Sequence, residues 1–137
     1  MLENQKKIKC CDPFLQHLLY EVAKITNLRI IEGLRTVDRQ QRLIDEGKSK
    51  ISNARHAPHV QGIAVDIIPL DKNREFHGWG EGKDEVKEVG MFYNLHGIIY
   101  TVAKHLIIPI RWGGDWDGDG SFKDQTFDDL VHYEVIK

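Results

Sequence analysis

Cysteine is scarce in this chain of 137 residues, which contains only Cys10 and Cys11. Adjacent cysteines rarely bridge each other, and with no third cysteine available a disulfide framework is excluded. The pair could bind zinc, but no second pair of cysteines or histidines lies near it in the sequence. We therefore expect two free thiols.

An excess of charge of one sign is also lacking, since 19 Lys and Arg stand against 21 Asp and Glu, for a net charge of −2. This balance argues against a nucleic-acid partner or an anionic membrane held by bulk charge. No apolar stretch approaches the roughly 20 residues of a membrane-spanning helix. The N-terminus also lacks the apolar core of a signal peptide. We expect synthesis in a cytosol and no stable membrane association.

The apolar share of 41% and the charged share of 29% are typical of a globular protein. We expect one domain over residues 1–137, and a monomer. Helical periodicity and capping residues predict helices from Pro13 to about Asn27, from Thr36 to Gly47 and from about Glu85 to His105. Short β-branched runs predict strands over residues 28–32, 62–68, 107–112 and 128–135. The fold class is therefore α+β.

The most informative stretch is the loop and strand over residues 56–69. From Gly62 onward Ile63, Val65 and Ile67 share one strand face, while Asp66 falls on the other face with two small residues. An acid in an apolar strand is costly unless it is paired. Asp66 could be a hydrogen-bonded structural residue, or it could hold a zinc ion together with His59, which stands just before the strand.

A second strand near the end of the chain carries His132, with Asp129 three residues before it and Glu134 two residues after it. If His59, Asp66 and His132 bind one zinc ion, a fourth position stays open for water. Such an open position is typical of a catalytic site rather than a structural one. The sequence has no H-E-x-x-H, which excludes the common zincin helix.

Four motifs occur in a characteristic order. They are G-x-R-T at residues 33–36, H-x-x-G-x-A-x-D at 59–66, R-W-G-G-D-W at 111–116 and D-x-x-H-x-E at 129–134. In this combination the chain resembles the M15 family of zinc peptidases over about residues 28–136. That family includes D-alanyl-D-alanine carboxypeptidases and dipeptidases and the phage L-alanyl-D-glutamate endolysins, and the third motif is similar to the endolysin branch.

The resemblance implies a small antiparallel sheet that carries the zinc site and is flanked by about three helices, as in D-Ala-D-Ala peptidases and hedgehog domains. It implies that Asp129 is the general base and then the proton donor, and that Arg35 stabilises the developing oxyanion. Glu134 would support His132 from behind. The implied substrate is the stem peptide of peptidoglycan, cut between L-alanine and D-glutamate, after a holin-type release from the host cytoplasm.

Several alternatives remain open. The family usually has Ser two residues before the ligand histidine, where this chain has Ala57, and His56 competes with His59 as a ligand. The nearest other activity is that of a D-alanyl-D-alanine carboxypeptidase or dipeptidase. A non-catalytic metal-binding module on the same fold is a different class of function, but such a module needs neither Asp129 nor Arg35.

A second cation site is suggested by D-x-D-x-D-G, which places Asp115, Asp117 and Asp119 at the alternate positions of a calcium loop. An EF-hand has Glu at the twelfth position, where this chain has Thr126. The segment is therefore interpreted either as a weak calcium site or as a simple acidic turn.

Two other polar residues receive a minor role. His96 lies on the apolar face of the last predicted helix, where a core histidine is favoured over a metal ligand. Gln40 resembles a further position of the M15 family, and contact with substrate is considered for it.

Overall fold

The computed structural model describes residues 1–123 and 128–137. Within these residues the helices are α1 (Pro13–Ala23), α2 (Val37–Asp45) and α3 (Glu85–Leu106), with short 3-10 turns at Gln5–Ile8 and Ala54–His56. The strands are β1 (Leu2–Glu3), β2 (Asn27–Glu32), β3 (Ala64–Leu70), β4 (Ile110–Gly113) and β5 (Asp129–Val135). They form one sheet in the order β1-β2-β3-β5-β4, which confirms the predicted α+β class.

The sheet is mixed rather than wholly antiparallel. Strands β2, β3, β5 and β4 pair in antiparallel fashion as expected, but β1 runs parallel to β2. The amino group of Met1 donates hydrogen bonds to the carbonyls of Ala23 and Thr26 and to the side chain of Asn27. These contacts at the end of α1 hold the first residues beside β2. Strand β1 is only two residues long, which is too short for the sequence pattern to predict it or its pairing.

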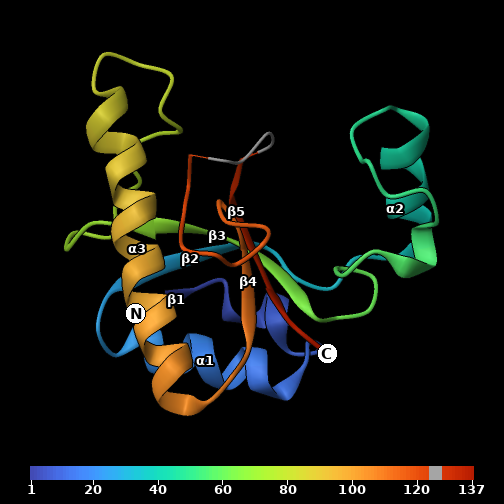
Figure 1. Ribbon diagram of the computed structural model, residues 1–137, viewed down its shortest axis with the longest axis horizontal. Helices are drawn as coiled ribbons and strands as arrows, with labels where there is room; N and C mark the ends of the chain where they lie inside the picture. The colour runs from blue at the N-terminus through green and yellow to red at the C-terminus, as the bar shows by residue number, and fades with distance from the viewer. Residues whose placement is uncertain (124–127) are drawn as a thin grey trace.

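Helices α1 and α3 cover one face of the sheet, whereas α2 stands apart from them (Figure 1). Val65 and Ile67 of β3 point into this helical layer and pack with Leu18 of α1 and Ile99 of α3 in one apolar core. Because strand side chains alternate, Asp66 lies on the opposite face of β3. The candidate ligand Asp66 and the apolar core that includes Val65 and Ile67 therefore lie on opposite faces of the sheet.

Several predicted boundaries differ from the structure: the strand predicted over residues 62–68 spans Ala64–Leu70, and two others were wrong for a clear reason. The first helix ends at Ala23 instead of about Asn27, because β2 already begins at that asparagine. The strand predicted over residues 107–112 starts later, since α3 continues to Leu106 and Ile107 takes a left-handed conformation with φ of 58°.

Among the described residues, no helix combines the length and apolarity that a membrane crossing requires.

Removing a core side chain tests this packing. Leu18 is fully buried, and Leu18→Ala is expected to lower the free energy of unfolding by about 3 kcal/mol because a cavity remains. Denaturant titration followed by circular dichroism measures the change. The control Ile25→Ala, at a side chain that is 63% exposed, should cost less than about 0.5 kcal/mol. Equal losses for the two variants would contradict the core described here.

Candidate metal centre

The structure brings His59, Asp66 and His132 together, with one potential ligand atom from each lying within 4.8 Å of the others. Oδ1 of Asp66 lies 3.1 Å from Nε2 of His59 and 3.3 Å from Nδ1 of His132. The two imidazole rings are nearly perpendicular, at 72°, with centroids 5.2 Å apart. One carboxylate oxygen therefore sits between two imidazole nitrogens that face a common point.

The sheet register explains how residues so distant in sequence meet. Asp66 on β3 is the direct partner of His132 on β5. His59 reaches them from the loop before β3, which turns back at Gly62 with φ of 73°. The N–H of Asp12 donates to the carbonyl of Gly62 at 2.7 Å and holds this turn against the start of α1. Only glycine adopts that backbone conformation at little cost.

Each histidine is oriented by a second partner on its other ring nitrogen. Nδ1 of His59 lies 2.9 Å from the carbonyl oxygen of Gly33, which can only accept, so Nδ1 donates this hydrogen bond and Nε2 is the nitrogen that faces Asp66. Nε2 of His132 lies 3.2 Å from Oε1 of Glu134. This arrangement is the usual support of metal-binding imidazoles. The sequence analysis included Gly33 in a motif but missed the role of its carbonyl, because a backbone carbonyl leaves no signature in the residue type.

The three groups neutralise one another. Burial would raise the pKa of Asp66, but hydrogen bonds from His132 and His59 hold it well below its usual range. Burial would lower the pKa of His132, yet its hydrogen bonds to Asp66 and Glu134 raise it to about 9. A divalent cation bound here would replace the proton on His132, as metal binding to imidazole generally does.

Asp129 and Arg35 adjoin this cluster. Burial, followed by the negative charge of Asp66, raises the pKa of Asp129, while the nearby cluster histidines and Arg35 oppose the rise. Gly113 of β4 allows β5 to place Asp129 there, since a Cβ on Gly113 would collide with the carbonyl oxygen of Asp129. A partly desolvated acid beside the cluster is the arrangement that a proton-transferring group needs.

The competing histidines lie elsewhere. His56 is exposed and outside the cluster, and Ala57 is buried beside it. His96 stacks on Trp112 with ring centroids 3.9 Å apart, and its Nδ1 lies 3.3 Å from the hydroxyl of Tyr133. Burial lowers the pKa of His96 to about 4. His96 is half-buried among aromatic rings and lies outside the cluster, as expected for a histidine that is not a ligand there.

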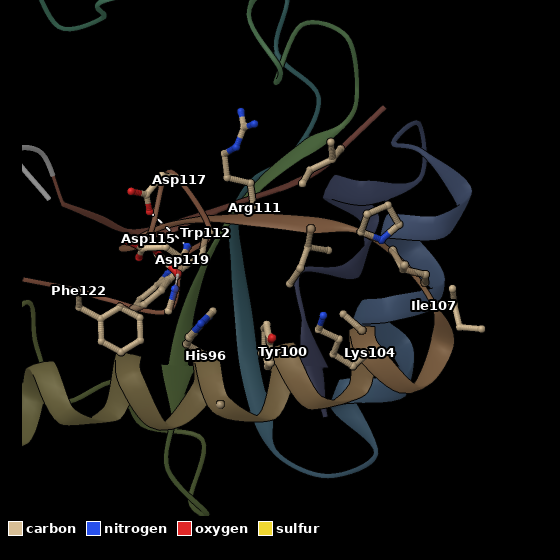
Figure 2. Close-up of a pocket in the computed structure, with 18 residues that line it drawn as sticks. His96, Tyr100, Lys104, Ile107, Arg111, Trp112, Asp115, Asp117, Asp119 and Phe122 are labelled. Carbon is tan, nitrogen blue, oxygen red and sulfur yellow. Dashed lines mark hydrogen bonds between the residues drawn. The ribbon is translucent and has the colours of Figure 1, made fainter. Parts of the chain in front are cut away.

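The acidic loop forms a second cluster, in which Asp115, Asp117 and Asp119 offer oxygens within 4.8 Å of one another. Figure 2 shows their side chains gathered beyond the end of β4. Asp115 is only 8% exposed, and its Oδ1 is buried without a hydrogen-bond partner among the described residues. The ring of Trp116, in the same loop, lies 5.4 Å from that of His132. Thr126 falls within residues 124–127, outside the described part.

A cavity of about 870 Å³ lies between α3 and β4 and reaches the acidic loop (Figure 2). Its walls include Tyr100, Lys104 and Trp112, but none of the three residues of the first cluster. The cavity and the cluster of possible metal ligands therefore lie in different parts of the molecule. We take the His59, Asp66 and His132 cluster as the candidate site, because it holds the convergent donor atoms and the perturbed acid.

Known proteins resemble this chain over nearly its full length. Residues 2–136 match the family model for the phage L-alanyl-D-glutamate peptidase. The L-alanyl-D-glutamate peptidase of Escherichia phage T5 is 24% identical over 139 residues, which cover 97% of this chain and 94% of that protein.

Two solved structures show the same fold. The L-Ala D-Glu endopeptidase ChiX of Serratia marcescens superposes with a TM-score of 0.75 at 18% identity, over 99% of this chain and 90% of that one. The LD-carboxypeptidase LdcB superposes with a TM-score of 0.55 at 14% identity, over 92% of this chain and 59% of that one. The β3–β5 frame of the cluster therefore belongs to a fold shared with peptidoglycan peptidases.

The cluster predicts an unusual titration in chelator-treated protein. His132 should titrate near pH 9 by NMR, and Glu134→Gln should lower its pKa because one charged partner is lost. A raised folded-state pKa stabilises the fold fully below the ordinary value of 6.5, and this stabilisation is lost as pH rises through about 9. The free energy of unfolding should fall across that range. A His132 pKa near 6.5 would contradict the pairing.

Proposed function

The chain belongs to the phage L-alanyl-D-glutamate peptidase family, and we propose that it is a zinc peptidase that cleaves peptidoglycan stem peptides between L-alanine and D-glutamate. The observation that carries this proposal is the meeting of His59, Asp66 and His132 around one point, with both imidazoles held from behind. Residues 1–137 would act as one catalytic domain, as a monomer, on the cell wall after a holin-type release.

Zinc fits the donor set better than a hard cation does. Two imidazole nitrogens and one carboxylate oxygen are typical zinc ligands, whereas calcium and magnesium prefer all-oxygen sites. His59 would bind through Nε2 and His132 through Nδ1, since their other nitrogens face Gly33 and Glu134. When bound, zinc would polarise the scissile carbonyl and lower the pKa of water toward about 7.

The chain's own residues supply the proton transfers and part of the charge stabilisation. Asp129 would accept the proton of the attacking water and then return it to the leaving amine, a role for which its raised pKa is suited. Arg35 would donate hydrogen bonds to the oxygen that becomes negative at the scissile carbonyl. A pure metal-binding module needs neither residue, which favours the enzyme.

We also propose that the acidic loop binds calcium. Its carboxylates stand at alternate positions, and a cation would give the buried Oδ1 of Asp115 a partner. Burial and repulsion from Asp117 and Asp119 raise the pKa of Asp115, and a cation would relieve both effects. Through Trp116 this loop touches the zinc ligand His132.

Hydrolysis of purified cell wall tests the catalytic proposal. Asp129→Asn should lower the rate of wall clearing by about 100-fold or more, because the proton acceptor is lost. Bound zinc, measured by elemental analysis, should stay the same as in the wild type. The neighbouring exposed acid gives a matched control, Asp128→Asn, which should stay close to wild-type activity.

The released fragments identify the bond. A new amino terminus on D-glutamate, found by mass spectrometry, would support the proposed endopeptidase. Free D-alanine would instead support a carboxypeptidase. No release by zinc-loaded wild-type protein would leave the non-catalytic module as the function.

Calorimetric titration of zinc-loaded protein with calcium chloride tests the second site. Asp115→Asn should weaken calcium binding by about 10-fold or more, since it removes one charged ligand. Asp38→Asn, at an exposed acid on α2, is the control and should bind calcium as the wild type does. Equal calcium affinity in the Asp115 variant, or no binding by the wild type at millimolar calcium, would refute the site.

A further inference from the structure

The guanidinium of Arg35 is held on two sides by the protein. Its Nε and Nη2 donate to the two carboxylate oxygens of Glu32, each at 2.8 Å, and its Nη1 donates to Oε1 of Gln40 at 2.6 Å. A guanidinium has five N–H donors. Within the part of the chain that the structure describes, these bonds use three of them and leave one on each terminal nitrogen.

Gln40 is the more informative partner, because it is a polar side chain with no exposed surface. Both ends of its amide are used, since Nε2 donates to Oγ of Ser49 at 2.9 Å. That oxygen also accepts the N–H of Ile51 at 3.2 Å. Burying an amide is costly unless its hydrogen bonds are made, so these contacts fix the position of Gln40. The substrate contact considered for Gln40 has no surface available to it here.

Glu32 is equally committed to this arrangement. Hydrogen bonds from Arg35, and also from Arg39, outweigh burial and lower its pKa to about 2. The carboxylate is therefore ionised at neutral pH. A two-pronged pairing of this kind fixes the plane of a guanidinium as well as its position.

The same residues are tied to the metal centre. Glu32, at the end of β2, is the register partner of Asp66 on β3. The backbone N–H of Arg35 donates to the carbonyl of His59 at 3.0 Å. The guanidinium is thus held in the same frame as two of the proposed zinc ligands.

We infer that Glu32 and Gln40 are positioning residues, which hold Arg35 so that the two remaining N–H groups of its terminal nitrogens face the substrate. This inference rests on the function proposed above. Two parallel donors at the end of a guanidinium suit one oxygen that gains negative charge during the reaction. Because the orientation is set before substrate arrives, losing it should affect the transition state more than the ground state.

The test uses a soluble disaccharide tetrapeptide and zinc-loaded protein. Gln40→Leu should lower kcat by about 10- to 100-fold with KM changed less than about three-fold, since a misplaced catalytic group costs rate rather than binding. Gln41→Leu makes the same change one position along α2, at an exposed side chain, and should leave kcat unchanged. Gln40→Glu keeps the acceptor for Arg35 and should restore most of kcat.

A double-mutant cycle separates positioning from general damage. If Gln40 acts through Arg35, adding Gln40→Leu to Arg35→Ala should change kcat by less than about two-fold. Losses that multiply, or a Gln40→Leu rate equal to that of Gln41→Leu, would overturn the inference. Should Gln40→Leu fail to fold, Glu32→Gln carries the same cycle, because it keeps the shape of the side chain and removes its charge.

One readout does not depend on turnover. The Nε–H proton of Arg35 should exchange slowly with water by NMR in the wild type and faster in Glu32→Gln. Unchanged exchange would overturn the inference even if the enzyme is active. An active Arg35→Ala variant with slow exchange in the wild type would instead refute the proposed role of Arg35 and leave the held guanidinium in place.

Discussion

The shared oxygen of Asp66 is the interaction on which the rest of the site depends. It faces one nitrogen of His59 and one of His132, and it is brought there by the direct pairing of β3 with β5. This placement requires the observed strand register. A shift of β3 by one residue would turn Asp66 toward the apolar core and Val65 toward the site, because strand side chains alternate. The packing of Val65 and Ile67 beneath the sheet therefore also fixes the chemistry above it.

Much of this arrangement could be predicted from the sequence. The alternation around Asp66 gave its face, and the spacings H-x-x-G-x-A-x-D and D-x-x-H-x-E gave the residues that meet. What escaped prediction has a common cause, since neither the carbonyl of Gly33 behind His59 nor the parallel pairing of β1 depends on a recognisable residue type. The partners of Arg35 were missed although they lie only three and five residues away, because Glu32 looks like an ordinary polar strand end in the sequence.

Boundaries failed where local and tertiary preferences compete. A β-branched run at residues 107–110 favours a strand, yet Ile107 ends α3 in a left-handed conformation and remains 88% exposed. The intrinsic strand preference of these residues is weak, and the packing of the long preceding helix α3 outweighs it. By contrast, α2 stands away from the helical layer, and buried Gln40 connects it to the site through side-chain hydrogen bonds. Hydrogen bonds of Gln40 help to fix the position of α2, whereas apolar packing fixes the positions of α1 and α3.

The pairing of opposite charges on Asp66 and His132 has a consequence for the protein before any ion is bound. A site made only of acids would repel itself until a cation arrived, whereas here a proton on His132 offsets part of the negative charge of Asp66 and Glu134. A proton on His132 thus stands where the proposed ion would bring its positive charge. If zinc is the bound ion, as proposed, such a protein would be able to take it up after folding.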